Sequence, residues 1–220
     1  MSVIDCSVHS TPYIPCLQNA GTKVVFRYYA RKKQPPPFAE KILEPAEAVA
    51  LSKAHISIGV VYQYNARSID KFNLEQGKSD GGFARSYAAN TIKQPAGSAI
   101  YFGVDYDPEH ADIEPYIVPH FHGLVAAMQE HKDYATYDIG VYGGWNVCDR
   151  LFKAGLVKFT WLSQSEGHGG REDRKKYVKS KAWDLMQGMP RTDLCDGLDY
   201  DLNTVKEGLQ SFGQFTVPHA

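Results

Sequence analysis

The sequence lacks an excess of charge, long apolar runs and a leader-like start, and each absence narrows what the chain can be. Its 220 residues carry 24 Lys and Arg against 25 Asp and Glu, a formal net charge of −1. We therefore expect no broad basic surface and no nucleic-acid partner. No stretch of about 18 apolar residues occurs, so we expect no membrane span. The N-terminus has no basic start followed by an apolar run, so it does not match a standard secretory signal.

Paired cysteine motifs are also missing. The four cysteines are Cys6, Cys16, Cys148 and Cys195, and none forms a C-x-x-C pair. This excludes a zinc ribbon and a thioredoxin-type motif. We expect reduced, partly buried thiols, with a Cys6–Cys16 bridge as an alternative that no motif supports.

A metal site is not indicated either. His120 and His122 form a His-x-His pair, but on a helix residues two apart point in divergent directions. Metal sites need convergent ligands. We therefore expect no metal and no cofactor.

What the sequence does have is a regular alternation of short apolar strands and amphipathic helices. Hydrophobic residues make up 43% and charged residues 22% of the chain, the usual mix of a folded domain. The pattern predicts strands at Val3–Cys6, Lys23–Tyr29, Ile56–Tyr64, Ser98–Asp105, Asp138–Tyr142, Phe159–Ser163, Trp183–Gln187 and Gly197–Asp201. It predicts helices at Pro45–Lys53, Gly82–Ile92, Ile113–His131, Trp145–Ala154, Arg171–Val178 and Thr204–Phe212.

Eight strands that alternate with helices indicate an α/β fold with a parallel sheet. Eight is also the number that closes a (β/α)8 TIM barrel, and residues 1–220 suit one compact domain of this kind. The rival is an open doubly wound sheet. That fold usually carries a Gly-rich phosphate loop after its first strand, and residues 7–10, Ser-Val-His-Ser, do not form one.

The fourth predicted strand carries the clearest chemical signal. Because strand side chains alternate between faces, Tyr101, Gly103, Asp105 and Asp107 share one face. In a barrel that face is the interior, and its last residues lie at the C-terminal mouth, where barrel active sites form. The spacing therefore predicts two carboxylates, Asp105 and Asp107, opening into one site.

Other predicted strands also end in polar or aromatic residues. Asp5 ends the first strand, and Asp199 and Asp201 share a face in the last one. Further candidates for binding substrate at the mouth are Arg27, Tyr29, Tyr62, Gln63, Tyr142, Trp161 and Asp201. The aromatic members could stack on sugars, although aromatic residues also fill cores.

Clustered acids suit acid–base chemistry. Closely spaced carboxylates raise one pKa, so one group holds a proton while its neighbour stays ionised. Glycoside hydrolysis needs that division of roles. The alternative is that some of these acids only cap helices or turns, as Asp107 before Pro108 could.

Taken in order, these segments resemble a known family. They are Asp5, Arg27-Tyr28-Tyr29, Val61-Tyr62-Gln63-Tyr64, the run Ile100–Asp107, Gly140-Val141-Tyr142-Gly143, Trp161 and Asp199-Tyr200-Asp201-Leu202-Asn203. The chain resembles the Rv2525c-like, glycoside-hydrolase-like TIM-barrel domains of unknown function, from about Val3 to Gly208. These domains are distantly similar to Chalaropsis-type (family 25) lysozymes, which cut peptidoglycan.

The resemblance implies a role for each acid. Asp105 matches the Asp of the lysozymes' Asp-x-Glu, Asp107 occupies the Glu position, and Asp5 and Asp199 match the first-strand and last-strand acids. Asp107 is one methylene shorter than Glu. The implied function is therefore a peptidoglycan hydrolase, with a non-catalytic glycan-binding or cell-envelope module as the alternative. A Cys-dependent amidase that uses Cys148 or Cys195 is a weaker alternative.

The implied substrate bears on location and partners. A wall-acting protein without a visible leader would be made in the cytoplasm and reach the periplasm or cell wall by a signal-independent route. It could act as an exported effector or a lytic enzyme, with a secretion apparatus or an immunity protein as partner. We expect a monomer.

Overall fold

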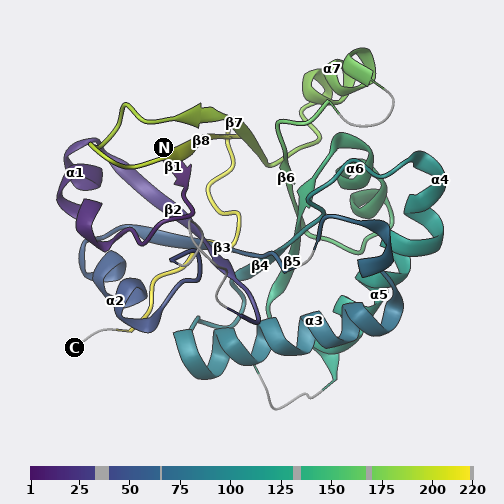
Figure 1. Cartoon of the computed structure of the whole chain (residues 1–220), viewed down its shortest axis with the longest axis horizontal. Helices are drawn as coiled ribbons and strands as arrows, with labels where there is room; N and C mark the ends of the chain where they lie inside the picture. The colour runs from purple at the N-terminus through teal and green to yellow at the C-terminus, as the bar shows by residue number, and fades with distance from the viewer. Residues whose placement is uncertain (33–39, 65, 131–134, 167–169, 219–220) are drawn as a thin grey trace.

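Eight strands close into a barrel in the order in which they occur along the chain. The computed structural model describes residues 1–32, 40–64, 66–130, 135–166 and 170–218 (Figure 1). The strands are β1 (Ser2–Asp5), β2 (Thr22–Tyr29), β3 (Ser57–Tyr62), β4 (Ala99–Gly103), β5 (Asp138–Gly143), β6 (Phe159–Leu162), β7 (Leu185–Arg191) and β8 (Tyr200–Val205). The closed eight-stranded α/β barrel expected from the sequence is confirmed.

The last strand runs against the others. β1 to β7 pair in parallel, whereas β8 is antiparallel to both β7 and β1. The helix expected at Thr204–Phe212 is wrong, because β8 continues to Val205 and an irregular segment follows. Gly208 adopts a φ of 82°, a backbone conformation that a helix does not allow and that glycine accepts at little cost.

Helices surround the strands (Figure 1). They are α1 (Ile14–Asn19), α2 (Pro45–Lys53), α3 (Leu74–Ser86), α4 (His110–Asp112), α5 (Val118–Gln129), α6 (Trp145–Lys153) and α7 (Gly170–Ser180). Two π-helical segments join them, η3 (Tyr87–Ile92) after α3 and η4 (Ile113–Ile117) before α5, and short 3-10 turns form η1 (Thr11–Tyr13) and η2 (Ile69–Lys71). In the part of the chain that the structure describes, no helix has the length and apolar character needed to cross a membrane.

Glycines let α3 and α5 approach closely. A Cβ on Gly77 would lie 1.9 Å from the carbonyl oxygen of His120, and one on Gly123 would lie 2.2 Å from that of Leu74. α3 begins eight residues before the expected start at Gly82, because the Asn73 side chain accepts a hydrogen bond from Gln76 N at 2.8 Å and caps it. The expected helix Ile113–His131 is η4 plus α5, and His131 lies outside the described residues.

The core has two layers, one inside the barrel and one between strands and helices. The inner layer contains Val3, Val24, Phe26, Val61, Ala99, Tyr101, Phe159, Trp161, Leu185 and Phe212. Phe212 belongs to the segment after β8 and accepts a hydrogen bond from Tyr101 Oη through its carbonyl at 2.9 Å. Ala99 N, at the start of β4, donates to Gly213 O at 2.9 Å. The segment after β8 therefore covers the N-terminal end of the barrel, opposite the C-terminal mouth.

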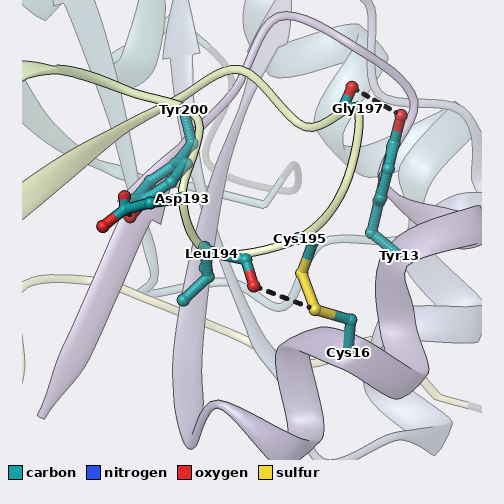
Figure 2. Close-up of a disulfide and its surroundings, with 7 residues drawn as sticks. All are labelled: Tyr13, Cys16, Asp193, Leu194, Cys195, Gly197 and Tyr200. Carbon is teal, nitrogen blue, oxygen red and sulfur yellow. Dashed lines mark hydrogen bonds between the residues drawn. A yellow bond between two sulfur atoms is a disulfide. The ribbon is translucent and has the colours of Figure 1, made fainter.

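A disulfide joins two distant parts of the chain. Cys16 of α1 bonds to Cys195 in the turn between β7 and β8, with 6.0 Å between the Cα atoms (Figure 2). Beside it, Tyr13 Oη donates to Gly197 O at 2.9 Å. The expectations of reduced Cys16 and Cys195, and of a Cys6–Cys16 bridge, are wrong. A sequence separation of 179 residues left no local signal for the pairing. Cys6 and Cys148 are free and buried.

Candidate functional site

A polar cavity of about 440 Å³ opens at the C-terminal mouth of the barrel. Residues from the ends of several strands line it, as in other barrels of this architecture. Its polar and aromatic side chains are those of Ser7, Tyr28, Lys41, Gln63, Arg67, Asp105, Tyr106, Asp107, Tyr142, Trp161, Ser163, Gln164, Ser165, Gln187 and Asp201.

Asp105 and Asp107 lie in this cavity, directly after β4. Asp105 N donates to the carbonyl oxygen of Ala66 at 2.8 Å, and Arg67 Nε donates to Asp105 Oδ2 at 2.8 Å. The hydroxyl of Ser165 donates to the carboxylate of Asp107. The structure therefore brings together the two acids that strand alternation predicted to share a site.

Asp5 lies at the end of β1 and is only 2% exposed. It accepts hydrogen bonds from Asn203 Nδ2 at 2.7 Å, from Gln187 Nε2 at 3.2 Å and from Tyr28 Oη at 3.4 Å. Burial raises its pKa from an ordinary 3.8 to about 7, and the nearby charge of Asp201 adds to the rise, while the three hydrogen bonds oppose it. At neutral pH Asp5 is therefore divided between its protonated and ionised forms.

Asp201 is coupled to Asp5. The two are paired across β1 and β8, and Gln187 Nε2 donates to Asp201 Oδ2 at 3.0 Å while also contacting Asp5. Partial burial raises the pKa of Asp201. One amide group thus bridges two acids that compete for charge, an arrangement typical of sites that hold a proton.

Asp199, which we expected beside these acids, does not join them. It lies in the turn before β8 and is exposed, and it is not among the residues that line the cavity. Because β8 is antiparallel, its first residues lie at the mouth, and preceding residues lead away from the barrel. Asp201 therefore takes the place at the mouth that we expected Asp199 to occupy.

Three expected substrate-binding residues face the helices instead of the cavity. In β2 the inward residues are Val24 and Phe26 of the inner core, followed by Tyr28, which lines the cavity, so Arg27 and Tyr29 point outward. Tyr29 Oη donates to Gln94 Oε1 at 2.8 Å. In β3, Tyr62 Oη donates to Asp80 Oδ1 at 2.7 Å.

Arg27 is fully buried and holds the framework of the site. Its Nε donates to Glu47 Oε1 at 2.8 Å, and its terminal nitrogens donate to the carbonyl oxygens of Cys6 and Glu40, each at 2.6 Å. Arg27 thereby links Cys6, which follows Asp5, to Glu40, which precedes Lys41. Because its side chain is fully buried and these donors are engaged, Arg27 does not line the cavity.

Gln63, Tyr142 and Trp161 do line the cavity. Tyr142 Oη donates to Gln187 Oε1 at 2.8 Å, and Trp161 Nε1 donates to Asn203 Oδ1 at 2.7 Å. The two rings pack edge to face, with 4.8 Å between centroids. They form a rigid aromatic wall next to the acids.

Several cavity residues were not predicted from the sequence. Gln187 could have been found, because it ends a predicted strand on the same face as Leu185. Tyr28 could have been found had the face of β2 been assigned from Phe26. Lys41 and Arg67 lie outside the strands, where alternation gives no signal.

Neither a metal centre nor a cysteine nucleophile is evident in the described segments. They contain no group of three or more His, Cys, Asp or Glu placed to hold a metal. His120 is buried and His122 exposed, so the pair does not converge. Cys195 is in the disulfide, and burial raises the pKa of Cys148, which disfavours its reactive thiolate. The amidase alternative therefore loses both candidate nucleophiles.

Comparison with known proteins agrees with this architecture. The family model for the Rv2525c-like, glycoside hydrolase-like domain matches residues 15–216. FadG of Bacillus subtilis, described as uncharacterized, is 33% identical over 218 residues. The match covers 91% of this chain and 37% of FadG, so the chain spans well under half the length of that relative.

Two solved structures share the fold. The Tat-secreted protein Rv2525c of Mycobacterium tuberculosis, in complex with L-tartrate, has a TM-score of 0.71 at 22% identity and matches 97% of this chain and 98% of its own. A family 25 glycosyl hydrolase from Bacillus anthracis has a TM-score of 0.52 at 14% identity and matches 96% of this chain and 90% of its own.

Proposed function

Since the chain belongs to the Rv2525c-like family of glycoside hydrolase-like domains, we propose that it is a glycosidase that cleaves cell-wall glycan in the cavity at the barrel mouth. One observation carries the proposal. Asp105, Asp107 and Asp201 line a single cavity that has an aromatic wall, with Asp5 buried beside it. Acids together with aromatic side chains are what sugar binding and acid–base hydrolysis require.

The proposed chemistry divides the acids by their partners. Asp107, which is exposed and accepts a hydrogen bond from the Ser165 hydroxyl, protonates the leaving oxygen as the glycosidic C–O bond breaks. A water molecule then adds to the anomeric carbon, and its proton returns to Asp107, which restores the acid. Asp105, which accepts a hydrogen bond from the Arg67 guanidinium, stabilises positive charge developing on the sugar. General acid catalysis of this kind contributes roughly 10²- to 10⁴-fold.

The Asp5–Asp201 pair sets the charge beneath the sugar. Gln187 holds both carboxyl groups, and the raised pKa values mean that near pH 7 the pair carries less than its full negative charge. A partly protonated pair beneath the sugar limits the repulsion among the four acids, and its remaining negative charge favours a cation developing on the sugar.

Peptidoglycan is the proposed substrate, because the acids fall in an order along the chain that resembles the lysozymes of family 25. The test is a turnover assay on purified peptidoglycan, with mass spectrometry of the released fragments. We expect Asp105→Asn and Asp107→Asn each to lower the rate at least about 100-fold.

Asp199→Asn is the matched control, because the same substitution is made on an exposed acid outside the cavity, and it should leave the rate unchanged. Cleavage at the wild-type rate by the Asp105→Asn/Asp107→Asn double variant would refute the proposal.

A second candidate is a glycan-binding module without turnover. The side chain of Asp107 reaches less far than a glutamate would at that position, and this favours binding without cleavage. The cavity and its aromatic wall suit a binding module as well as they suit a hydrolase. Saturable binding of peptidoglycan fragments with no new reducing ends would identify this function.

We also propose that the protein works outside the cytoplasm. The Cys16–Cys195 disulfide supports this, because such bonds persist in oxidising compartments. The structural neighbour Rv2525c is itself described as Tat-secreted. If the proposal holds, directing the chain to the periplasm of a test bacterium should cause lysis, and the same amount kept in the cytoplasm should not.

A further inference from the structure

We propose that the cavity selects glycans that carry a carboxylate and that Lys41 and Arg67 bind this group. The inference rests on the proposed function and narrows its substrate class. It comes from two cations that the proposed acid–base chemistry does not require, both on the wall of the cavity that holds the acids.

Lys41 is held in position at this wall. Its Nζ lies 2.5 Å from Gln63 Oε1 and 4.0 Å from the centre of the Tyr28 ring. The backbone beside it is also fixed, because Ile42 forms a bridge with Tyr28 and Leu43 N donates to Tyr28 O at 2.9 Å. An amide oxygen and an aromatic face together hold an ammonium group in a defined place within the cavity.

Arg67 supplies the second cation from the segment after β3. Its Nε bonds to Asp105 Oδ2, and 72% of its side chain is exposed at the rim. A guanidinium presents its donors in a planar fork, so one edge can contact Asp105 while another remains accessible to a ligand carboxylate. Arg67 is thus placed to bind a negatively charged group of the substrate next to Asp105, a proposed catalytic acid.

The two cations lie close enough to affect each other. The charge of Arg67 lowers the pKa of Lys41 and that of Asp105 raises it, while burial, the largest cause, brings it to about 8. Lys41 is therefore still mostly charged at neutral pH, although it is partly desolvated. A carboxylate placed between Lys41 and Arg67 would form charge-assisted hydrogen bonds with both cations, and a neutral sugar would not.

Uronic acids and muramyl residues are two kinds of sugar that carry such a carboxylate. In a uronic acid it is attached to the ring, and in a muramyl residue it belongs to the lactyl ether. Both are planar and singly charged, so the same two cations can bind either. The length of the linker between ring and carboxylate distinguishes them.

The test measures binding separately from cleavage. In the Asp107→Asn background, calorimetry at pH 6.5 would compare a muramyl-containing tetrasaccharide and an oligoglucuronate with their carboxyl-reduced forms. We expect each carboxylated ligand that fits to bind more tightly than its reduced form. Adding Lys41→Met or Arg67→Gln should weaken binding of the carboxylated form by roughly 10- to 100-fold and leave the reduced form unchanged.

Lys158→Met is the matched control, because Lys158 also contacts an acid, Asp138, and an aromatic ring, Phe159, but lies outside this cavity. It should change neither affinity. In Arg67→Gln, Lys41 is the remaining cation of the two, and loss of the Arg67 charge leaves its pKa higher than in the wild type. The preference for carboxylate should therefore decline only as the pH rises above about 8.

The outcomes separate the two proposals. Equal binding of carboxylated and reduced ligands, or equal weakening of both by Lys41→Met, overturns the inference and leaves the proposed function standing. Binding of none of the four ligands overturns both. A preference confined to the muramyl or to the glucuronate pair supports the inference and identifies the source of the carboxylate.

Discussion

Asp5 combines almost complete burial with three hydrogen-bond donors, so its ionisation is linked to the stability of the fold. Its pKa lies above the ordinary 3.8, which means that the folded state holds a proton that the unfolded state releases between about pH 4 and pH 7. In that range the unfolded state binds fewer protons, so stability falls as the pH rises. The shift corresponds to a loss of roughly 4 kcal/mol across the window.

We predict that Asp5→Asn removes most of this decline. Urea unfolding at intervals from pH 5 to pH 8 should show a falling free energy of unfolding for the wild type and a nearly flat one for the variant. Asp199→Asn, at an exposed acid, should keep the wild-type slope. A variant slope equal to that of the wild type would assign the decline to other groups.

The sequence correctly predicted that the acids after β4 face the cavity, but it assigned the wrong face of β2 to the barrel interior. In β4 the acids that follow the strand fall on one face, with Tyr101 and Gly103, so alternation was enough to assign that face to the barrel interior. In β2 both faces are buried, and apolar and aromatic residues occur on each, so alternation alone could not decide which of Arg27 and Tyr28 faced inward. Lys41 and Arg67 depend on the path of chain segments between elements, which no local pattern encodes.

Among the elements, the contact between α3 and α5 depends on missing side chains. Gly77 and Gly82 lie on the same helix, but a Cβ on Gly77 would meet the His120 carbonyl at 1.9 Å, whereas a Cβ on Gly82 would meet nothing within 4 Å. The two positions therefore separate the packing requirement for glycine from its low intrinsic helix propensity.

We predict that Gly77→Ala destabilises the protein by about 1–3 kcal/mol, because α3 and α5 must move apart. Gly82→Ala should instead stabilise it by up to about 1 kcal/mol through helix propensity. Thermal unfolding of both variants provides the measurement. Equal effects at the two positions would show that packing at Gly77 is not limiting.

The element that the sequence misassigned is the one after β7. Alternation indicated a strand near residues 197–201 and an amphipathic pattern indicated a helix after it, and neither pattern specifies direction. Residues 192–199 connect β7 to β8 without a helix, and such a connection suits an antiparallel neighbour, because a parallel one needs a longer crossover. Strand alternation therefore predicted both Asp199 and Asp201 at the mouth, whereas the structure brings Asp201 there and not Asp199.

For the whole molecule, the disulfide ties the first helix to the final hairpin. Because the bridged residues are 179 apart, nearly the entire barrel lies within the loop that the bond closes. In a chain-entropy account, closing a loop of this length stabilises the folded state by roughly 5 kcal/mol. The same hairpin carries Gln187 and Asp201, so the bond also supports one wall of the cavity.

We predict that the Cys16→Ser/Cys195→Ser double variant unfolds at a markedly lower urea concentration than the oxidised wild type. Dithiothreitol should bring the wild type to the same midpoint and leave the double variant unchanged, because Cys6 and Cys148 are already free. A wild-type midpoint that does not respond to the reductant under unfolding conditions would contradict the role assigned to the bond.

The strands of the β7–β8 hairpin can also become longer without moving the acids and Gln187 at the mouth. Its register shifts between Gln187 and Pro190, with Gln187 opposite Asn203 below the irregularity and Pro190 opposite Asp201 above it. Residues inserted in both arms beyond Pro190 would lengthen the rim without moving the pairs beneath it. Such insertions would alter the extent of the mouth while Asp5, Gln187 and Asp201 keep their places. Because Cys195 lies in the turn, however, each added pair would carry it farther from Cys16, so the bridge limits how long the rim can become.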